Sequence, residues 1–187
     1  MRNKILLFFV LGIAAVLPLP LLAGPITVNG PWYEFSFTGG VGASAAACTA
    51  CVPGPGAVAI DTPPWTFSGA ADLTVVDAFN IGDSFNVFDN GILIGTTSAP
   101  VGSGTCGGDP VVCLANPNVS RGVFHLGAGA HSITITVLTT VGAGAAYLTV
   151  TAPVAVAAPM LSTYVLLGLA LFMTMIGSAY LTRRRDT

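Results

Sequence analysis

The chain has 187 residues, of which 53% are hydrophobic and only 7% are charged. Five of its six Lys and Arg residues lie close to the two ends, whereas seven of its eight acids lie between them. Residues 24–158 therefore hold a single cation, Arg121, and a formal charge near −6, which makes nucleic acids and anionic surfaces implausible partners.

The N-terminal segment 1–23 has the three parts of a secretory signal peptide. Arg2 and Lys4 form a positive start, and residues 5–16 form an apolar stretch too short to span a bilayer. The following prolines break the helix, and Ala23 provides a small residue for cleavage. We expect cleavage after Ala23, with an uncleaved N-terminal anchor as the alternative.

Short alternating runs fill residues 24–152, and no amphipathic helix pattern appears. In 32–37 the side chains of Tyr33, Phe35 and Phe37 share one face, and 132–139 shows the same period of two. Asn90-Gly91 supplies the positive φ angles that a tight hairpin turn needs. Further strands are expected at 26–29, 57–60, 65–68, 72–79, 84–89, 91–97, 122–126 and 145–151, with loops at 39–56 and 99–117. This pattern predicts an all-β fold, an antiparallel β-sandwich of the jelly-roll kind.

The four cysteines form two local pairs, Cys48 with Cys51 and Cys106 with Cys113. In an exported protein an even number of cysteines indicates disulfides. We favour Cys106–Cys113 and Cys48–Cys51, while crossed pairing stays open because spacing does not decide connectivity. A four-thiolate zinc site is disfavoured because six residues separate the second pair, and a redox pair because 48–51 lies in a Gly/Pro/Ala-rich loop.

No catalytic constellation emerges. Gly82-Asp83-Ser84-Phe85 resembles the nucleophile block of a lipase and esterase family, which also needs an Asp two residues before a His. Neither His125 nor His131 has such a partner. We therefore expect a protein that is not an enzyme, and a secreted hydrolase is the least favoured alternative.

Two binding hypotheses remain for this segment. Asp77, Asp83 and Asp89 recur every six residues around strand ends, so they are weak calcium candidates, although Asp is also common in turns. No other cofactor is expected. The aromatic side chains of Trp32, Tyr33, Trp65 and Tyr147 would suit a carbohydrate platform, but their alternation favours core packing.

The C-terminal segment predicts a membrane anchor. Residues 153–160 read as a linker and motif, and 161–182 as one transmembrane helix, whose uncharged stretch would extend about 31 Å at about 1.5 Å per residue. Residues 183–187 form a cytoplasmic tail, since Arg183, Arg184 and Arg185 do not easily cross a bilayer. A glycolipid anchor signal is disfavoured because the chain ends in basic residues.

This tail resembles the PEP-CTERM-like sorting signals that exosortases recognise. The motif 158–162, Ala-Pro-Met-Leu-Ser, is closest to the Ile-Pro-Thr-Leu-Ser variant and matches it at Pro159, Leu161 and Ser162. The stretch LTVVDAFNIGDSFNVFDNGILIGTTS is similar to the β-rich ectodomains of such proteins. The resemblance implies recognition of these three residues, processing near Pro159, and Arg183–Arg185 as the stop-transfer cluster.

These observations together predict an exported, non-enzymatic surface or extracellular-matrix protein, structural or adhesive. It would be held at first in the inner membrane by one helix and then transferred outside. Its expected partners are the export machinery and an exosortase-type enzyme, with extracellular polysaccharide as a further candidate. The alternative is a carbohydrate- or calcium-binding module on the same scaffold.

Overall fold

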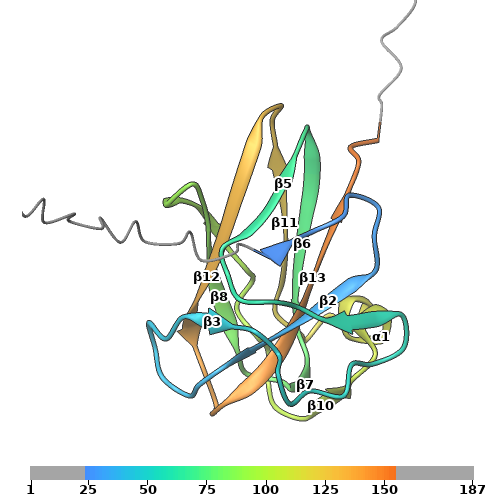
Figure 1. The fold of residues 1–187 in the computed structure, drawn as a ribbon. Coiled ribbons are helices and arrows are strands. Elements are labelled where there is room, and N and C mark those ends of the chain that lie inside the picture. The colour runs from blue at the N-terminus through green and yellow to red at the C-terminus, as the bar shows by residue number, and fades with distance from the viewer. Residues whose placement is uncertain (1–23, 155–187) are drawn as a thin grey trace, which may run out of the picture. The chain divides into compact units, whose positions relative to one another are not determined.

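The computed structural model describes residues 24–154, and these form a β-rich, sandwich-like body (Figure 1). Residues 24–153 of this body belong to one compact unit. One sheet has five strands in the order β1 (Gly24–Pro25), β5 (Trp65–Ser68), β12 (Ala130–Thr139), β8 (Ser84–Asp89) and β9 (Ile92–Thr96). The other has the order β11 (Arg121–Leu126), β6 (Ala71–Asp77), β13 (Gly144–Thr151), β2 (Trp32–Phe37) and β3 (Ala45–Ala46), with β4 (Ala57–Ala59) also beside β2.

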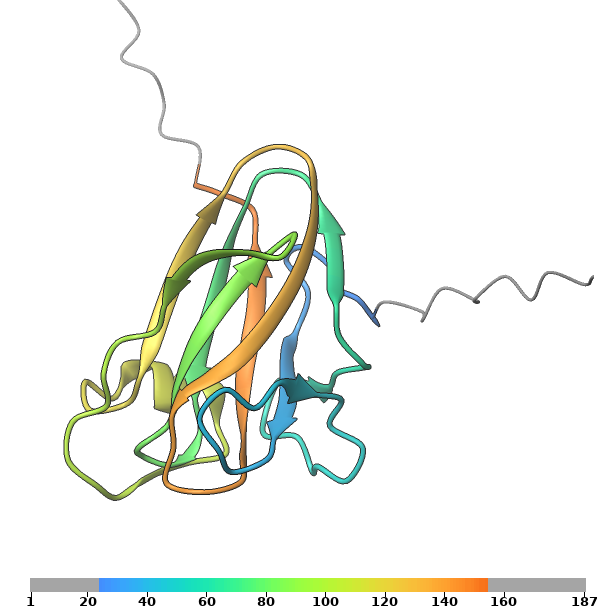
Figure 2. The same ribbon diagram turned by 90° about the vertical axis from the view of Figure 1, so that its left-hand side faces the viewer.

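Two further elements complete the body. A short ribbon pairs β7 (Phe79–Asn80) with β10 (Thr105–Gly107), and α1 (Pro110–Ala115) follows β10. Figures 1 and 2 place β7, β10 and α1 toward one end of the sandwich, and the β5–β6 and β11–β12 turns at the opposite end. The end with the ribbon therefore carries the long connection between β9 and β10 together with the β12–β13 turn, and the other end carries the β5–β6 and β11–β12 turns.

The main core lies between the two large sheets. Alternate residues of each strand point inward, so Phe35 of β2 contacts Trp65 of β5 and Phe85 of β8, with ring centroids 5.5 and 5.6 Å apart. Leu73, Val75, Ile133 and Leu148 are fully buried in the same cluster. Burial of these apolar side chains is the main force that holds the sheets together.

A second, smaller apolar cluster lies on the outer face of the β6–β13–β2 sheet. Its members include Val76, Tyr147 and Cys113, and the half-buried Trp32 packs against it. Because α1 and the loop 47–56 between β3 and β4 cover this face, both faces of the sheet are buried here. This cover explains why Val76 and Tyr147 are as inaccessible as the core residues beside them.

Several predicted strands are confirmed to the residue. β2, β5 and β8 occupy 32–37, 65–68 and 84–89 as the alternation predicts. The hairpin between β8 and β9 turns at Asn90 and Gly91, with φ angles of 51° and 78°. Short-range patterning is sufficient in these places because each strand has one apolar face.

Four expectations are wrong, the first being the loop expected at 39–56, which contains the two-residue strand β3. Residues 26–29 form a turn instead of a strand, in which Gly30 N–H donates to the Thr27 carbonyl and Asn29 has a φ of 59°. The strand expected at 72–79 ends at Asp77, because Phe79 adopts a left-handed φ of 58°. The expected loop 99–117 contains β10 and α1, so one short helix is present where the sequence showed no helical pattern.

The helix α1 depends on its cap. The Asp109 carboxylate accepts hydrogen bonds from Val111 and Val112 N–H, at 2.9 and 3.3 Å, and Pro110 opens the helix. An Asp followed by Pro is a helix-start signal, but six residues are too few to produce an apolar period. In residues 24–154 no helix is long and apolar enough to cross a membrane, and the span expected at 161–182 lies outside this range.

Candidate functional site

The predicted processing residues lie outside the described part of the chain. This applies to Ala23 at the signal cleavage site and to Pro159, Leu161, Ser162 and Arg183–Arg185 of the sorting tail. Their roles therefore stay predictions. The candidate site described below is built from residues of the sandwich.

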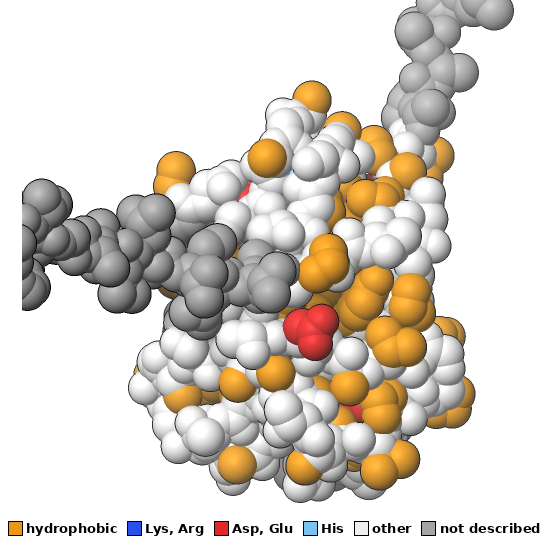
Figure 3. Space-filling view, viewed as in Figure 1, with side chains coloured by type: hydrophobic (Ala, Val, Ile, Leu, Met, Phe, Trp, Pro, Cys, Tyr) orange, Lys and Arg blue, Asp and Glu red, His pale blue; other side chains and the backbone are white. Residues whose placement is uncertain are grey.

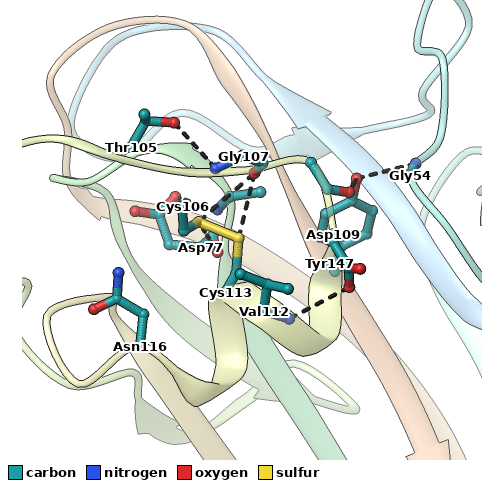
Figure 4. The surroundings of a disulfide bond; sticks show 12 residues. Gly54, Asp77, Thr105, Cys106, Gly107, Asp109, Val112, Cys113, Asn116 and Tyr147 are labelled. Carbon is teal, nitrogen blue, oxygen red and sulfur yellow. Dashed lines mark hydrogen bonds between the residues drawn. A yellow bond between two sulfur atoms is a disulfide. The ribbon is translucent and has the colours of Figure 1, made fainter.

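The second disulfide loop, 106–113, joins β10 to α1, as Figure 4 shows. The Cα atoms of Cys106 and Cys113 are 5.0 Å apart, and Cys113 is fully buried against the outer apolar cluster. The favoured pairing is confirmed. Because the bond ties a six-residue helix to a strand, it restrains a segment that is too short to be stable alone.

The first disulfide loop, which we define as 47–56, connects β3 to β4 and contains the Cys48–Cys51 pair. Cys48 bonds to Cys51 with a Cα separation of 5.3 Å, and Cys48 N–H donates to the Ile60 carbonyl. The sulfur atoms and a carboxylate oxygen of Glu34 lie within 4.8 Å of one another. Because the two sulfurs are bonded to each other, neither is a free thiolate for a metal, and no helix follows the pair as a thioredoxin-like site would require.

The two disulfide loops meet over the Tyr147 hydroxyl, on the outer face of β13. This hydroxyl lies 2.7 Å from the Gly108 carbonyl, 3.3 Å from Gly54 N and 3.3 Å from Glu34 Oε2. A phenol has one proton, which the short contact assigns to Gly108, while Gly54 N–H donates to the phenol oxygen. The contact with Glu34 Oε2 would then be a hydrogen bond if Glu34 carried a proton and donated it to the phenol oxygen. Burial raises the pKa of Glu34, which favours this protonated form, although the hydrogen bond to Tyr147 opposes the shift.

The contact between the loops leaves no room for a side chain at Gly54. A Cβ atom there would overlap the carbonyl oxygen of Gly108. Burial also raises the pKa of Tyr147 to about 12, with the nearby Glu34 carboxyl adding to the effect. Tyr147 is therefore a neutral, structural hydroxyl and a poor general base near neutral pH.

A groove of about 470 Å³ opens beside this junction, and we call it the outer groove. Its floor includes the cross-strand neighbours Ser36 of β2 and Ala145 of β13. One wall is formed by the first disulfide loop, the opposite wall by the segment after β6, and the end by the β12–β13 turn. The complete lining is Ser36, Thr49, Ala50, Cys51, Ala78, Phe79, Asn80, Asp83, Val141, Gly142, Ala143, Gly144 and Ala145.

Phe79 is the distinctive side chain of the outer groove. It is 38% exposed, and no other aromatic side chain in residues 24–154 is exposed. A φ of 58° is rare for a bulky residue and marks local backbone strain. The strain is held by Asp77, whose carboxylate accepts from Ala78 N–H at 2.8 Å and Asp83 N–H at 3.2 Å.

The three calcium candidates do not gather at one site. Asp77 holds the turn after β6, the Asp83 Oδ1 accepts from Val141 N–H at 2.9 Å, and Asp89 accepts from Ser132 N–H at 3.0 Å. Asp89 belongs to the other sheet, at the far end of β8. Burial, followed by the charge of Asp83, raises the pKa of Asp77 to about 7. Each carboxylate thus has a visible role in holding backbone N–H groups.

The candidate catalytic residues Ser84, His125 and His131 do not form hydrogen bonds with one another. Ser84 is buried at the start of β8 and shares a 2.7 Å hydrogen bond with Thr139. The His131 ring is hydrogen-bonded through Nδ1 to Asp89 Oδ2 at 2.8 Å and through Nε2 to the Gly127 carbonyl oxygen at 3.0 Å. His125 lies on another strand, 2.7 Å from Asp72. Among the described residues, neither imidazole is hydrogen-bonded to a serine, threonine or cysteine side chain.

The aromatic residues singled out as a carbohydrate platform are not one. Trp65 and Tyr147 are fully buried, Tyr33 is buried in the main core, and Trp32 is half-buried. Core packing, the favoured interpretation, is confirmed for them. The sequence does not predict the exposure of Phe79, because a strand over 72–79 would turn its side chain inward with Leu73 and Val75.

The surface around these features is nearly uncharged. The face of the described part in Figure 3 shows hydrophobic side chains, several of them grouped beside an acidic side chain near the centre, and no Lys or Arg. The one cation of this part, Arg121, donates to the Asn116 carbonyl at 2.7 Å and does not line the outer groove. Comparisons with protein-family models, curated proteins and solved structures found no match to this chain.

Proposed function

We propose that this chain is an exported, non-enzymatic surface or matrix protein, structural or adhesive. The observation that carries the proposal is the pair of disulfides, each closing a local loop against the outer face of one sheet. Disulfides persist in oxidising compartments and are rare in the cytosol, which supports a location outside the cytoplasm. The scarcity of cations fits a partner other than nucleic acid.

A role without catalysis is supported by the placement of the reactive groups. Ser84 is buried and bonded to Thr139, and both imidazoles of the described part are paired with aspartates. General base catalysis needs a base within hydrogen-bond reach of the proton that it takes. A scaffold with a small binding groove accounts for these residues more simply than an active site does.

Delivery to the surface is assigned in this proposal to the two ends. The signal peptide is removed after Ala23, and an exosortase-type enzyme reads Pro159, Leu161 and Ser162. Arg183–Arg185 hold the tail in the cytoplasm until processing. The support is the order of motif, apolar span and basic cluster in the sequence.

We also propose a jelly-roll arrangement for the sandwich. Its eight principal strands, β2, β5, β6, β8, β9, β11, β12 and β13, can be numbered one to eight along the chain. The sheets then have the orders 6-3-8-1 and 2-7-4-5. Successive strands alternate between the sheets except for strands four and five, which form the β8–β9 hairpin within one sheet, and this pattern is that of a jelly roll.

The sorting proposal is tested with an epitope tag after Thr187 in cells that contain an exosortase. We expect surface-extracted wild-type protein to lack the tag and Pro159→Ala to retain it. Pro153→Ala is the matched control, because it removes another proline of the same linker outside the motif. Mass spectrometry that finds the tag intact on surface-extracted wild-type protein contradicts the sorting proposal.

The export proposal has its own measurement. Both disulfides should be present in protein from the surface fraction, so its cysteines should resist alkylation until a reductant is added. Reactive, unpaired cysteines together with recovery only from the cytoplasm would overturn it.

A further inference from the structure

We propose that the outer groove binds a segment of a neutral carbohydrate chain. The inference rests on the proposed function, since a surface or matrix location brings the protein into contact with polysaccharide. The outer groove is a different site from the aromatic set Trp32, Tyr33, Trp65 and Tyr147. Four observations lead to the inference: the shape, the exposed ring, the polar lining and the charge.

The shape comes from small residues. The floor and the end of the outer groove carry Ala145, Gly144, Ala143 and Gly142, so the sheet surface is not filled by side chains there. A volume of about 470 Å³ lies in the usual range of small-ligand sites. The walls are restrained by the Cys48–Cys51 disulfide on one side and by the Asp77 hydrogen bonds on the other. A preformed site spends little free energy on ordering when it binds.

The exposed ring offers a flat apolar surface. Phe79 lines the outer groove, and its ring lies so close to Gly108 that a Cβ there would be 3.0 Å from the Phe79 Cε1 atom. The second disulfide loop therefore supports the ring from behind. A pyranose ring presents a patch of C–H groups on one face, which packs well on an aromatic ring, with hydroxyls around its edge.

The hydroxyls of such a ring would find partners around Phe79. Ser36, Thr49 and Asn80 line the outer groove with two hydroxyls and an amide, and Asp83 adds a carboxylate. The Ser36 hydroxyl donates to the Ala47 carbonyl at 2.8 Å, which leaves its lone pairs free to accept. Asp83 is held in place by Val141 N–H, so its position does not depend on a ligand.

Charge decides between neutral and acidic sugars. The lining contains one carboxylate, Asp83, and no Lys or Arg. Uronates, sulfates and phosphates need cationic partners and would be repelled by Asp83 and by the acidic body around it. The outer groove thus suits uncharged hexose or N-acetylhexosamine units.

A second hollow, of about 370 Å³, lies on the outer face of the five-stranded sheet. It is lined in part by Phe88, Thr134 and Thr136. Its aromatic ring is only half-exposed, and its polar lining is smaller, so we assign the carbohydrate to the outer groove. Phe88 then serves as the matched control for Phe79.

The test uses the full chain, purified in detergent, on an array of neutral oligosaccharides of glucose, galactose, mannose and N-acetylglucosamine, with uronate oligosaccharides alongside. We expect binding to at least one neutral series and none to the uronates. For the strongest binder, Phe79→Leu should weaken affinity about tenfold, since it keeps the apolar volume but removes the flat ring. Phe88→Leu should leave affinity unchanged.

A second variant tests the shape. Ala145→Phe fills the floor of the outer groove and should abolish binding, whereas Ala130→Phe makes the same change at an exposed position of β12 and should not. Intact disulfides and an unchanged melting temperature confirm that each variant is folded. Because Phe79→Leu and Ala145→Phe act independently, misfolding of one leaves the other as a test.

The inference is overturned if no neutral oligosaccharide binds, if only uronates bind, or if the folded groove variants bind like the wild type. These outcomes are separate from the proposed function. A protein that is exported and processed but binds no sugar contradicts only the groove assignment. A protein that binds sugar through Phe79 but stays in the cytoplasm contradicts only the proposed location.

Discussion

At the scale of single residues, the junction of the disulfide loops depends on the absence of one side chain. Gly54 approaches the Gly108 carbonyl so closely that a Cβ would overlap it, and Gly54 N–H also donates to Tyr147. The Gly54 requirement is steric, because the obstacle is backbone and cannot rotate away. The positions of both loops, and of the groove wall, follow from this contact.

The first prediction follows directly. Gly54→Ala should lower the free energy of unfolding by about 1–3 kcal/mol, because the loops must separate to admit a methyl group. Gly127→Ala is the control, since no atom lies within 4 Å of a Cβ at that position, and its effect should stay within about 0.5 kcal/mol. Urea unfolding without reductant measures both, and equal stability of the two variants would contradict the predicted junction.

At the scale of elements, the Cys106–Cys113 disulfide stabilises one short segment, the helix α1. It holds α1 over the outer apolar cluster, where the helix covers Val76 and Tyr147. Helix capping by Asp109 supplies only part of the stability that six residues need. The disulfide and the cluster therefore act together on one segment, and the main core lies on the other side of the sheet.

The second prediction concerns the Cys106→Ala, Cys113→Ala double variant. Its free energy of unfolding should fall by about 2–3 kcal/mol, and amides of α1 should lose protection from hydrogen exchange while those of β12 keep it. The Cys48→Ala, Cys51→Ala variant is the matched comparison and should leave α1 protected. Uniform loss of protection across both sheets would show that the bond supports the whole fold instead.

The strands and loops also show which structural features the sequence predicts and which it does not. Alternation predicts β2 and β8 because their pattern is local, and the short spacing within each cysteine pair favours the disulfides that form. The break at Phe79 leaves no mark on the alternation of apolar residues, because it depends on hydrogen bonds from the N–H groups of Ala78 and Asp83 to the Asp77 carboxylate. The outer groove was equally hidden, since its lining comes from four separate segments that only the sheet order brings together.

At the scale of the whole molecule, the unusual feature is the near-absence of cations around several buried acids. Glu34, Asp77 and Asp83 are buried without any Lys or Arg partner among the described residues. Backbone N–H donors lower part of the cost of burying the Asp77 and Asp83 carboxylates, and for Glu34 and Asp77, whose pKa values burial raises, protonation lowers it further. The stability of the body should therefore depend on pH in a defined direction.

The third prediction is that the body is more stable at mildly acidic pH than above neutrality. Asp77 has a folded pKa of about 7 against 3.8 for the free side chain, because of burial and the charge of Asp83. Between these values the folded state binds more protons than the unfolded state, so the free energy of unfolding falls as pH rises. The raised pKa of Glu34, which burial causes, acts in the same direction over the acidic range.

His131 extends the decline past neutrality. Burial lowers its pKa, but the hydrogen bonds to Asp89 and to the Gly127 carbonyl outweigh this and raise it above 6.5. Its contribution is present below that value and is lost as pH rises through the folded pKa. Urea unfolding between pH 5 and 8.5 should give a falling curve, with a shallower slope between pH 5 and 7 in Asp77→Asn, even if that variant is less stable throughout. A wild-type curve that rises over this range would mean that Asp77 is ionised in the folded protein, and that its N–H donors outweigh its burial.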